Sequence, residues 1–155
     1  MRRGLGFAED GGALSDGRRG AVDDTYYVLG LAACARGSYE EAVAALETSA
    51  QRFGDPVSLA WLGMVYGRAG KHDMARAVMQ QLEARGVSQH LPSCLAWVHL
   101  GLGEQGPALD WLEKARAEHD AQVLWTRVSP LYDPLRDAPR FRRLVDSLGL
   151  PPPGP

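Results

Sequence analysis

The sequence predicts an all-α fold, an α-solenoid of three helical hairpins with a C-terminal capping helix. The first observation is a repeat, because Leu29, Leu62 and Leu95 lie 33 residues apart and similar residues recur around each of them. The second is the helical spacing of apolar residues within each copy. The third is the absence of strand signals such as period-two alternation or Asn-Gly turns. A repeat of this length is too short for a domain and suits one helical hairpin that stacks on its neighbours.

Each copy contains two helical stretches separated by a glycine. The copies share a small residue, the glycine, an alanine and a large apolar residue at matching positions: Gly30, Gly37, Ala42 and Leu46; Gly63, Gly70, Ala75 and Met79; Ala96, Gly103, Ala108 and Leu112. The middle glycine ends the first helix because glycine adopts the left-handed conformation at low cost. We expect the small residues to face each other across the hairpin, so that its two helices approach closely.

Helix starts are predicted from capping residues. Ser38 and Glu41 have the spacing of a capping box, which places a helix start after Ser38. Asp55 and Pro56 predict another start, with the aspartate as cap and the proline in the first turn, and Pro92 predicts a similar start in the third copy. The resulting repeats span about 23–55, 56–88 and 89–120.

The two ends of the chain differ from the repeats. Residues 1–20 are rich in glycine and lack the apolar segment of a signal peptide, so we expect a flexible lead-in or a linker. Residues 121–150 predict a capping tail that completes a helical domain at 21–150, and residues 151–155 a disordered end. The tail carries one apolar stripe, with Asp137 as its expected cap: Phe141, Leu144, Val145 and Leu148.

The repeats resemble the tetratricopeptide repeat over about residues 23–120. The resemblance rests on the small-residue pair, the helix-breaking glycine, Tyr39 or His72, and the following alanine and large apolar residue. The period of 33 departs from the commoner 34, and the terminal proline of the motif is missing. The tail, with Asp-Pro-Leu-Arg, Pro-Arg-Phe and Leu-Gly-Leu-Pro, resembles a segment that closes such arrays in bacterial proteins. This likeness implies a position at the C-terminus of a larger signalling or regulatory chain.

Composition excludes several classes of function. A net charge of −2 argues against general attraction to nucleic acid or anionic lipid. The tail arginines are interleaved with aspartates, which predicts a solvated face with local ion pairs and no nucleic acid partner. No run of about 18 apolar residues occurs, so we expect no membrane span. Two distant cysteines, Cys34 and Cys94, suit a reducing compartment and predict a cytoplasmic location.

No reaction centre can be assembled from the sequence. The four histidines lack partners at metal-ligand spacing, so no metal site is predicted. Glu40 and Glu41, like Asp23 and Asp24, are adjacent and therefore point to different helix faces. Phosphate loops, dinucleotide motifs and nucleophile elbows are absent. We therefore expect no enzyme and no cofactor.

The resemblance implies that the first helix of each copy lines a concave groove. The expected contact residues are aromatic, aliphatic and soft, with Arg68 as a polar anchor: Tyr27, Leu31, Trp61, Met64, Arg68, Cys94 and Trp97. Such residues anchor interfaces, although apolar residues at helical spacing also form cores. The predicted function is a non-catalytic protein-interaction module that binds an apolar peptide or helix. The alternatives are homodimerisation or a regulatory C-terminal portion of a longer signalling protein or transcription regulator.

Overall fold

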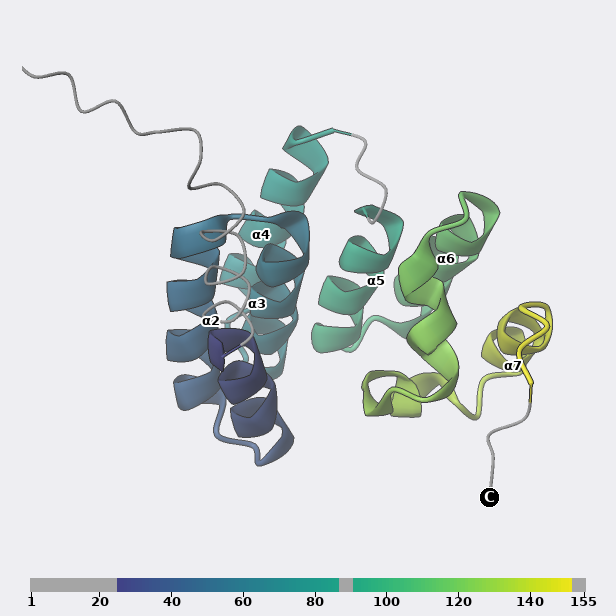
Figure 1. Cartoon of the computed structure of the whole chain (residues 1–155), viewed down its shortest axis with the longest axis horizontal. Coiled ribbons are helices and arrows are strands. Elements are labelled where there is room, and N and C mark those ends of the chain that lie inside the picture. Colours follow the sequence, from purple (N-terminus) through teal and green to yellow (C-terminus); the bar gives the residue numbers. More distant parts are fainter. Residues whose placement is uncertain (1–24, 87–90, 152–155) are drawn as a thin grey trace, which may run out of the picture.

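A computed structural model describes residues 25–86 and 91–151. In this part of the chain the regular structure is entirely helical, which confirms the predicted fold class. The helices pair in antiparallel fashion along the chain and stack side by side (Figure 1). The pairs are residues 25–35 with α2 (Tyr39–Phe53), α3 (Pro56–Arg68) with α4 (His72–Ala84), and α5 (Leu91–Gly101) with α6 (Gln105–Ala117).

The turn inside each pair repeats with the sequence. Gly37, Gly70 and Gly103 have φ of 77°, 76° and 77°, the left-handed conformation that the repeat predicts. The following residue donates its backbone N–H five residues back in every copy, over 2.9 Å, 2.8 Å and 2.9 Å. This is the Schellman arrangement, which satisfies carbonyl groups that the end of a helix leaves open.

The predicted capping box at Ser38 is wrong. The side chain of Ser38 makes no capping hydrogen bond, and Glu41 pairs with Arg36 over 3.3 Å instead. The reason is the turn: Ser38, Lys71 and Glu104 occupy the same position in the three copies and have nearly the same backbone angles. The backbone of the turn therefore sets the start of the second helix, whichever side chain follows the glycine.

Asp55 caps α3 as the sequence predicts. Its Oδ1 accepts hydrogen bonds from the N–H groups of Val57 and Ser58 over 3.0 Å and 2.9 Å, and its Oδ2 accepts one from the Ser58 hydroxyl. Replacing Asp55 with alanine leaves these donors without their acceptor. We expect D55A to lower the free energy of unfolding by about 1–2 kcal/mol, measured by urea denaturation. An unchanged denaturation midpoint would contradict the capping role.

Helix α5 is capped by a distant residue. Leu91 precedes Pro92 in the helix, so the proline lies in its first turn. Asp120, which is 2% exposed, follows α6 and accepts a hydrogen bond from the N–H of Ser93 over 3.2 Å. Its other oxygen accepts from the N–H of Gln122 over 2.9 Å. One buried carboxylate thus joins the start of α5 to the start of the tail.

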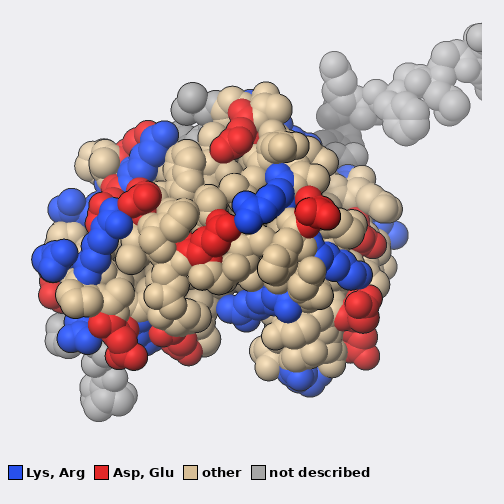
Figure 2. Space-filling model, turned by 180° about the vertical axis from the view of Figure 1, so that it is seen from behind, with Lys and Arg blue, Asp and Glu red and all other residues tan. Residues whose placement is uncertain are grey.

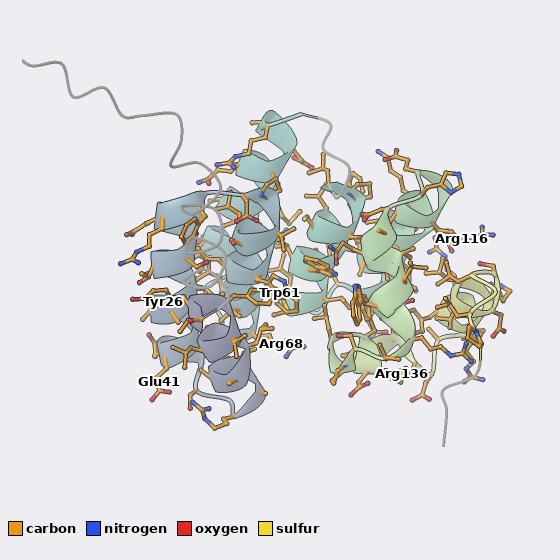
Figure 3. All side chains as sticks on the ribbon, viewed as in Figure 1. Tyr26, Glu41, Trp61, Arg68, Arg116 and Arg136 are labelled. Carbon is orange, nitrogen blue, oxygen red and sulfur yellow. The ribbon has the colours of Figure 1, made fainter. Side chains whose placement is uncertain are left out.

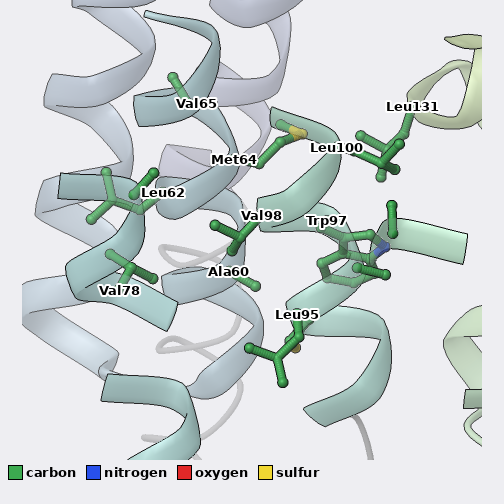
Figure 4. Packing of buried hydrophobic residues seen from close by; sticks show 14 of the residues in the cluster. Ala60, Leu62, Met64, Val65, Val78, Leu95, Trp97, Val98, Leu100 and Leu131 are labelled. Carbon is green, nitrogen blue, oxygen red and sulfur yellow. The ribbon is translucent and has the colours of Figure 1, made fainter. Parts of the chain in front are cut away.

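Gly30 and Gly63 of the first helices leave room for branched apolar side chains of the neighbouring helices. A Cβ on Gly30 would lie 2.7 Å from Cγ of Leu46, and a Cβ on Gly63 would lie 2.9 Å from methyl groups of both Val78 and Val98. The nearest neighbours of these glycines are therefore large side chains, and not the alanines that the sequence suggested. Figure 4 shows Val78 and Val98 in this core.

A closer contact joins consecutive pairs. Gly67 of α3 and Gly101 of α5 lie where the two helices meet, and a Cβ on Gly67 would be 2.5 Å from the carbonyl carbon of Gly101. A Cβ on Gly101 would be 2.7 Å from Cα of Met64. Both neighbours are backbone atoms, which cannot move aside as a side chain can. The two glycines therefore set the distance between α3 and α5.

The tail is more elaborate than a single capping helix. Two short 3-10 helices, η2 (Ala121–Arg127) and η3 (Pro130–Leu135), precede α7 (Pro139–Asp146). Pro134 has no N–H to donate and thus suits a short irregular helix better than a continuous α-helix. Asp137 does not cap α7, because the cap position falls on Ala138 and carries no side-chain hydrogen bond.

The tail is fastened to the repeats by apolar and charged contacts. Phe141 and Leu144 of the predicted stripe are buried, Val145 and Leu148 are partly buried, and the Phe141 ring stacks on Tyr132 at 6.0 Å. Arg140 forms ion pairs with Asp110 and Glu113 of α6, each at 2.6 Å. The hydrogen bonds from Arg140 lower the pKa of Glu113. Helix α7 therefore lies against the last helix pair (Figure 1).

Candidate functional site

The first helices of the pairs carry a row of aromatic rings. Tyr27, Trp61 and Trp97 come from the 25–35 helix, α3 and α5, respectively. The Tyr27 and Trp61 rings meet edge to face at 5.6 Å, and the Trp61 and Trp97 rings are tilted by 35° at 5.2 Å. Side chains of successive pairs form this row because each pair presents its first helix on the same side of the stack. We call these three residues the aromatic row.

The tail lies opposite the aromatic row. A cavity of about 510 Å³ separates them, and its tail side consists of Gln122, Trp125, Ser129, Leu131 and Tyr132. The remaining lining is the aromatic row with Leu31, Val57 and Ser58. The hydroxyl of Tyr132 accepts a hydrogen bond from the indole N–H of Trp97 over 2.7 Å, which joins the two sides at the end of the cavity.

A second cavity continues the first along α3. It has a volume of about 680 Å³ and shares Leu31, Trp61, Ser129 and Leu131 with the first. Its further lining includes Cys34, Met64, Tyr39 and two cations, Arg36 and Arg68. We call the two cavities together the aromatic groove. Figure 3 shows Trp61 and Arg68 on α3, facing the tail, and Glu41 at the opposite edge of the molecule.

The structure places four of the predicted contact residues in the groove with part of their surface free. Tyr27, Leu31 and Trp61 are partly buried and line the first cavity, and Arg68 is partly buried and lines the second. The indole N–H of Trp61 is buried and has no hydrogen-bond acceptor within the described residues. An unpaired donor of this kind costs about 1–3 kcal/mol.

The other three predicted contact residues belong largely to the core. Met64 is 1% exposed and Trp97 3% exposed, although each contributes to one cavity. Cys94 is fully buried and lines neither cavity. Burial raises the pKa of its thiol to about 12, with contributions from Asp120 and Asp55, so the thiolate is scarce at neutral pH.

Sequence reasoning missed the tail side of the groove. Trp125 and Leu131 are apolar and lie in the predicted capping tail. No local sequence pattern predicts that this tail packs against the first helices of the pairs. Trp125 is 61% exposed and also lines a separate surface pocket together with Leu150 and Pro151. The one signal in the sequence was the residue type, because tryptophan is enriched in interfaces.

A polar cluster of three residues lies outside the groove. Glu104 pairs with Nδ1 of His99 at 2.6 Å and with Arg76 at 2.8 Å, and these hydrogen bonds lower the pKa of Glu104. The three residues join α4, α5 and the turn before α6. Within residues 25–86 and 91–151, no three histidine, cysteine, aspartate or glutamate side chains are grouped so that they could hold a metal ion.

Comparison with known proteins supports the repeat. The sequence model of the tetratricopeptide repeat family matches residues 56–81. The chain contains a tetratricopeptide repeat. The matched range holds α3 and most of α4, and thus Trp61, Met64 and Arg68. The repeat implies a module for protein–protein interaction in general and is typical of non-catalytic proteins. No curated protein and no solved structure shows significant similarity to the chain.

None of the helices in the described part of the chain has the length and hydrophobicity needed to cross a bilayer. Figure 2 shows cationic and anionic residues interspersed over one face of the molecule. A face of this kind lacks the strong basic bias that nucleic acid recognition normally needs.

Proposed function

We propose that the domain is a non-catalytic interaction module that binds an apolar peptide or helix in the aromatic groove. The observation that carries this proposal is the cavity between the aromatic row and the tail. Its volume of about 510 Å³ lies within the range of ligand sites in proteins, about 300–1,000 Å³. Aromatic side chains on both sides supply large, rigid contact area, which is the usual source of hot spots.

Trp61 is the residue to test, because it lies in the middle of the aromatic row and lines both cavities. We expect Trp61→Ala to weaken the binding of an apolar partner by about 2 kcal/mol, roughly 30-fold in Kd, as truncation of a hot spot does. Binding is measured by calorimetry, with peptides selected from a display library or a partner purified from cells.

Trp111 provides the matched control. It lies on α6, outside the groove, with the Lys114 ammonium 4.8 Å from its ring centre. Trp111→Ala removes the same side chain and is expected to leave the affinity unchanged. Equal losses in both variants would show that the partner does not use the groove, and an unchanged affinity for Trp61→Ala would contradict the proposal directly.

Homodimerisation is a second candidate, favoured by apolar residues exposed at the end of the stack. Val28 and Leu29 of the 25–35 helix are 57% and 54% exposed, whereas Leu62 and Leu95, the matching residues of the next pairs, are buried. The later leucines have a preceding pair beside them. Analytical ultracentrifugation decides, since a mass of one chain at micromolar concentration removes this candidate. A regulatory role within a longer bacterial protein is a third candidate, and the upstream reading frame tests it.

A further inference from the structure

Arg68 is a partly buried cation in the aromatic groove. It is the last residue of α3, and its Nη1 lies 3.8 Å from the sulfur of Cys34. No carboxylate within the described residues pairs with it. Arg36, the other cation of the second cavity, already pairs with Glu41. A cation that has lost part of its hydration and has no counter-ion is stabilised when an anion arrives.

The charged residues that line the groove are all cationic. The two cavities are lined by Arg36 and Arg68, and no aspartate or glutamate appears in either lining. Elsewhere on the described surface, some arginines pair with carboxylates, as Arg76, Arg136 and Arg140 do. The groove therefore combines an uncharged aromatic end with a cationic end, and its complement is a segment that is apolar at one end and acidic at the other.

The distance between Trp61 and Arg68 sets the expected separation between the apolar residue and the acidic residue of the partner. Trp61 and Arg68 are seven residues apart on α3, which is about 10 Å along a helix axis at 1.5 Å per residue. An extended chain covers about 10 Å with three residues. In an extended partner, the apolar residue that contacts Trp61 and the acidic residue that pairs with Arg68 are thus about three positions apart.

We infer that the partner is an extended peptide segment in which an aspartate or glutamate, about three residues from a large apolar residue, pairs with Arg68. This inference rests on the proposed function and names the chemistry of its ligand. The guanidinium binds the carboxylate, and the aromatic row binds the apolar side chain.

The test is selection from random peptides displayed inside a loop of a carrier protein, so that no peptide offers a free carboxyl end. The full-length chain serves as bait in four forms: wild type, Arg68→Gln, Arg116→Gln and Trp61→Ala. Arg116 lies on the exposed surface of α6, so its substitution changes the net charge equally without touching the groove (Figure 3). We expect wild type and Arg116→Gln to select an acid about three positions from an apolar residue. Arg68→Gln is expected to select apolar peptides without the acid.

A selected peptide then completes a double-mutant cycle. Amidating its acid, Glu to Gln or Asp to Asn, is expected to weaken binding to wild type roughly tenfold, as loss of a charge-assisted hydrogen bond does. The same change is expected to alter binding to Arg68→Gln less than about twofold, and the wild-type difference is expected to shrink in about 1 M salt.

The outcomes separate this inference from the proposed function. Selection of apolar peptides that show no acidic preference, or the same preference with Arg68→Gln, overturns the inference and leaves the groove function intact. If wild type selects nothing that Trp61→Ala does not select, both fail.

Discussion

Replacing Trp97 with alanine is expected to lower the free energy of unfolding by about 4 kcal/mol. Trp97 is 3% exposed and lies between Trp61 of α3 and Tyr132 of η3, on the side of α5 that faces the tail (Figure 4). The substitution removes a large buried side chain and the donor to the Tyr132 hydroxyl. Chemical denaturation followed by circular dichroism measures the loss. Since natural domains are stable by only about 5–15 kcal/mol, much of the variant will unfold at low denaturant.

Tyr132→Phe separates the hydrogen bond from the packing. It keeps the ring and leaves the Trp97 indole N–H buried without an acceptor, so we expect a smaller loss, about 1–3 kcal/mol. The sequence predicts Trp97 as a contact residue of the groove, whereas the structure places it largely in the core. A loss below about 1 kcal/mol in Trp97→Ala would contradict this core role.

Gly101→Ala is expected to cost about 3 kcal/mol, although it adds a single methyl group. The new Cβ would meet the backbone of Met64 on α3, and backbone atoms within a helix cannot yield without moving the helix. The two helices must then separate, which disturbs the α3–α5 contact and the Trp61–Trp97 pair. Thermal or urea denaturation of the variant measures the cost.

Gly106→Ala is the matched control for this prediction. Gly106 lies within α6 and is exposed, and a Cβ added there would meet no atom within 4 Å apart from its own helix and chain neighbours. The same substitution there is expected to change the free energy of unfolding by less than about 1 kcal/mol, because the added methyl group meets no neighbouring atom. If Gly101→Ala is tolerated as well as Gly106→Ala, α3 and α5 do not meet as described.

Features that repeat along the chain could be predicted from the sequence. The glycine turns follow from Gly37, Gly70 and Gly103, because only the left-handed conformation explains a glycine at the same place in every copy. Asp55 followed by Pro56 predicted the start of α3 for an equally local reason. The capping box predicted at Ser38 does not form, because the Ser38 N–H already donates to the Ala33 carbonyl and Glu41 pairs with Arg36.

Features that depend on distant residues could not be predicted. Asp120 caps α5 from beyond α6, and the contact of Gly67 with Gly101 arises only when two pairs stack. The same holds for the groove. Helical spacing located Trp61 and Arg68, but the burial of Trp97 depends on Tyr132 of the tail, whose return to the first helices has no local sequence signal.

In the proposed function, the partner enters between the aromatic row and the tail. The four tryptophans test it in a single titration, because each indole N–H gives its own resonance in a nitrogen–proton correlation spectrum. Adding a selected peptide to the full chain is predicted to shift the signals of Trp61 and Trp125, which line the two sides of the first cavity, and to leave that of Trp111 in place. A shift of Trp111 with Trp61 and Trp125 unmoved would contradict binding in the aromatic groove.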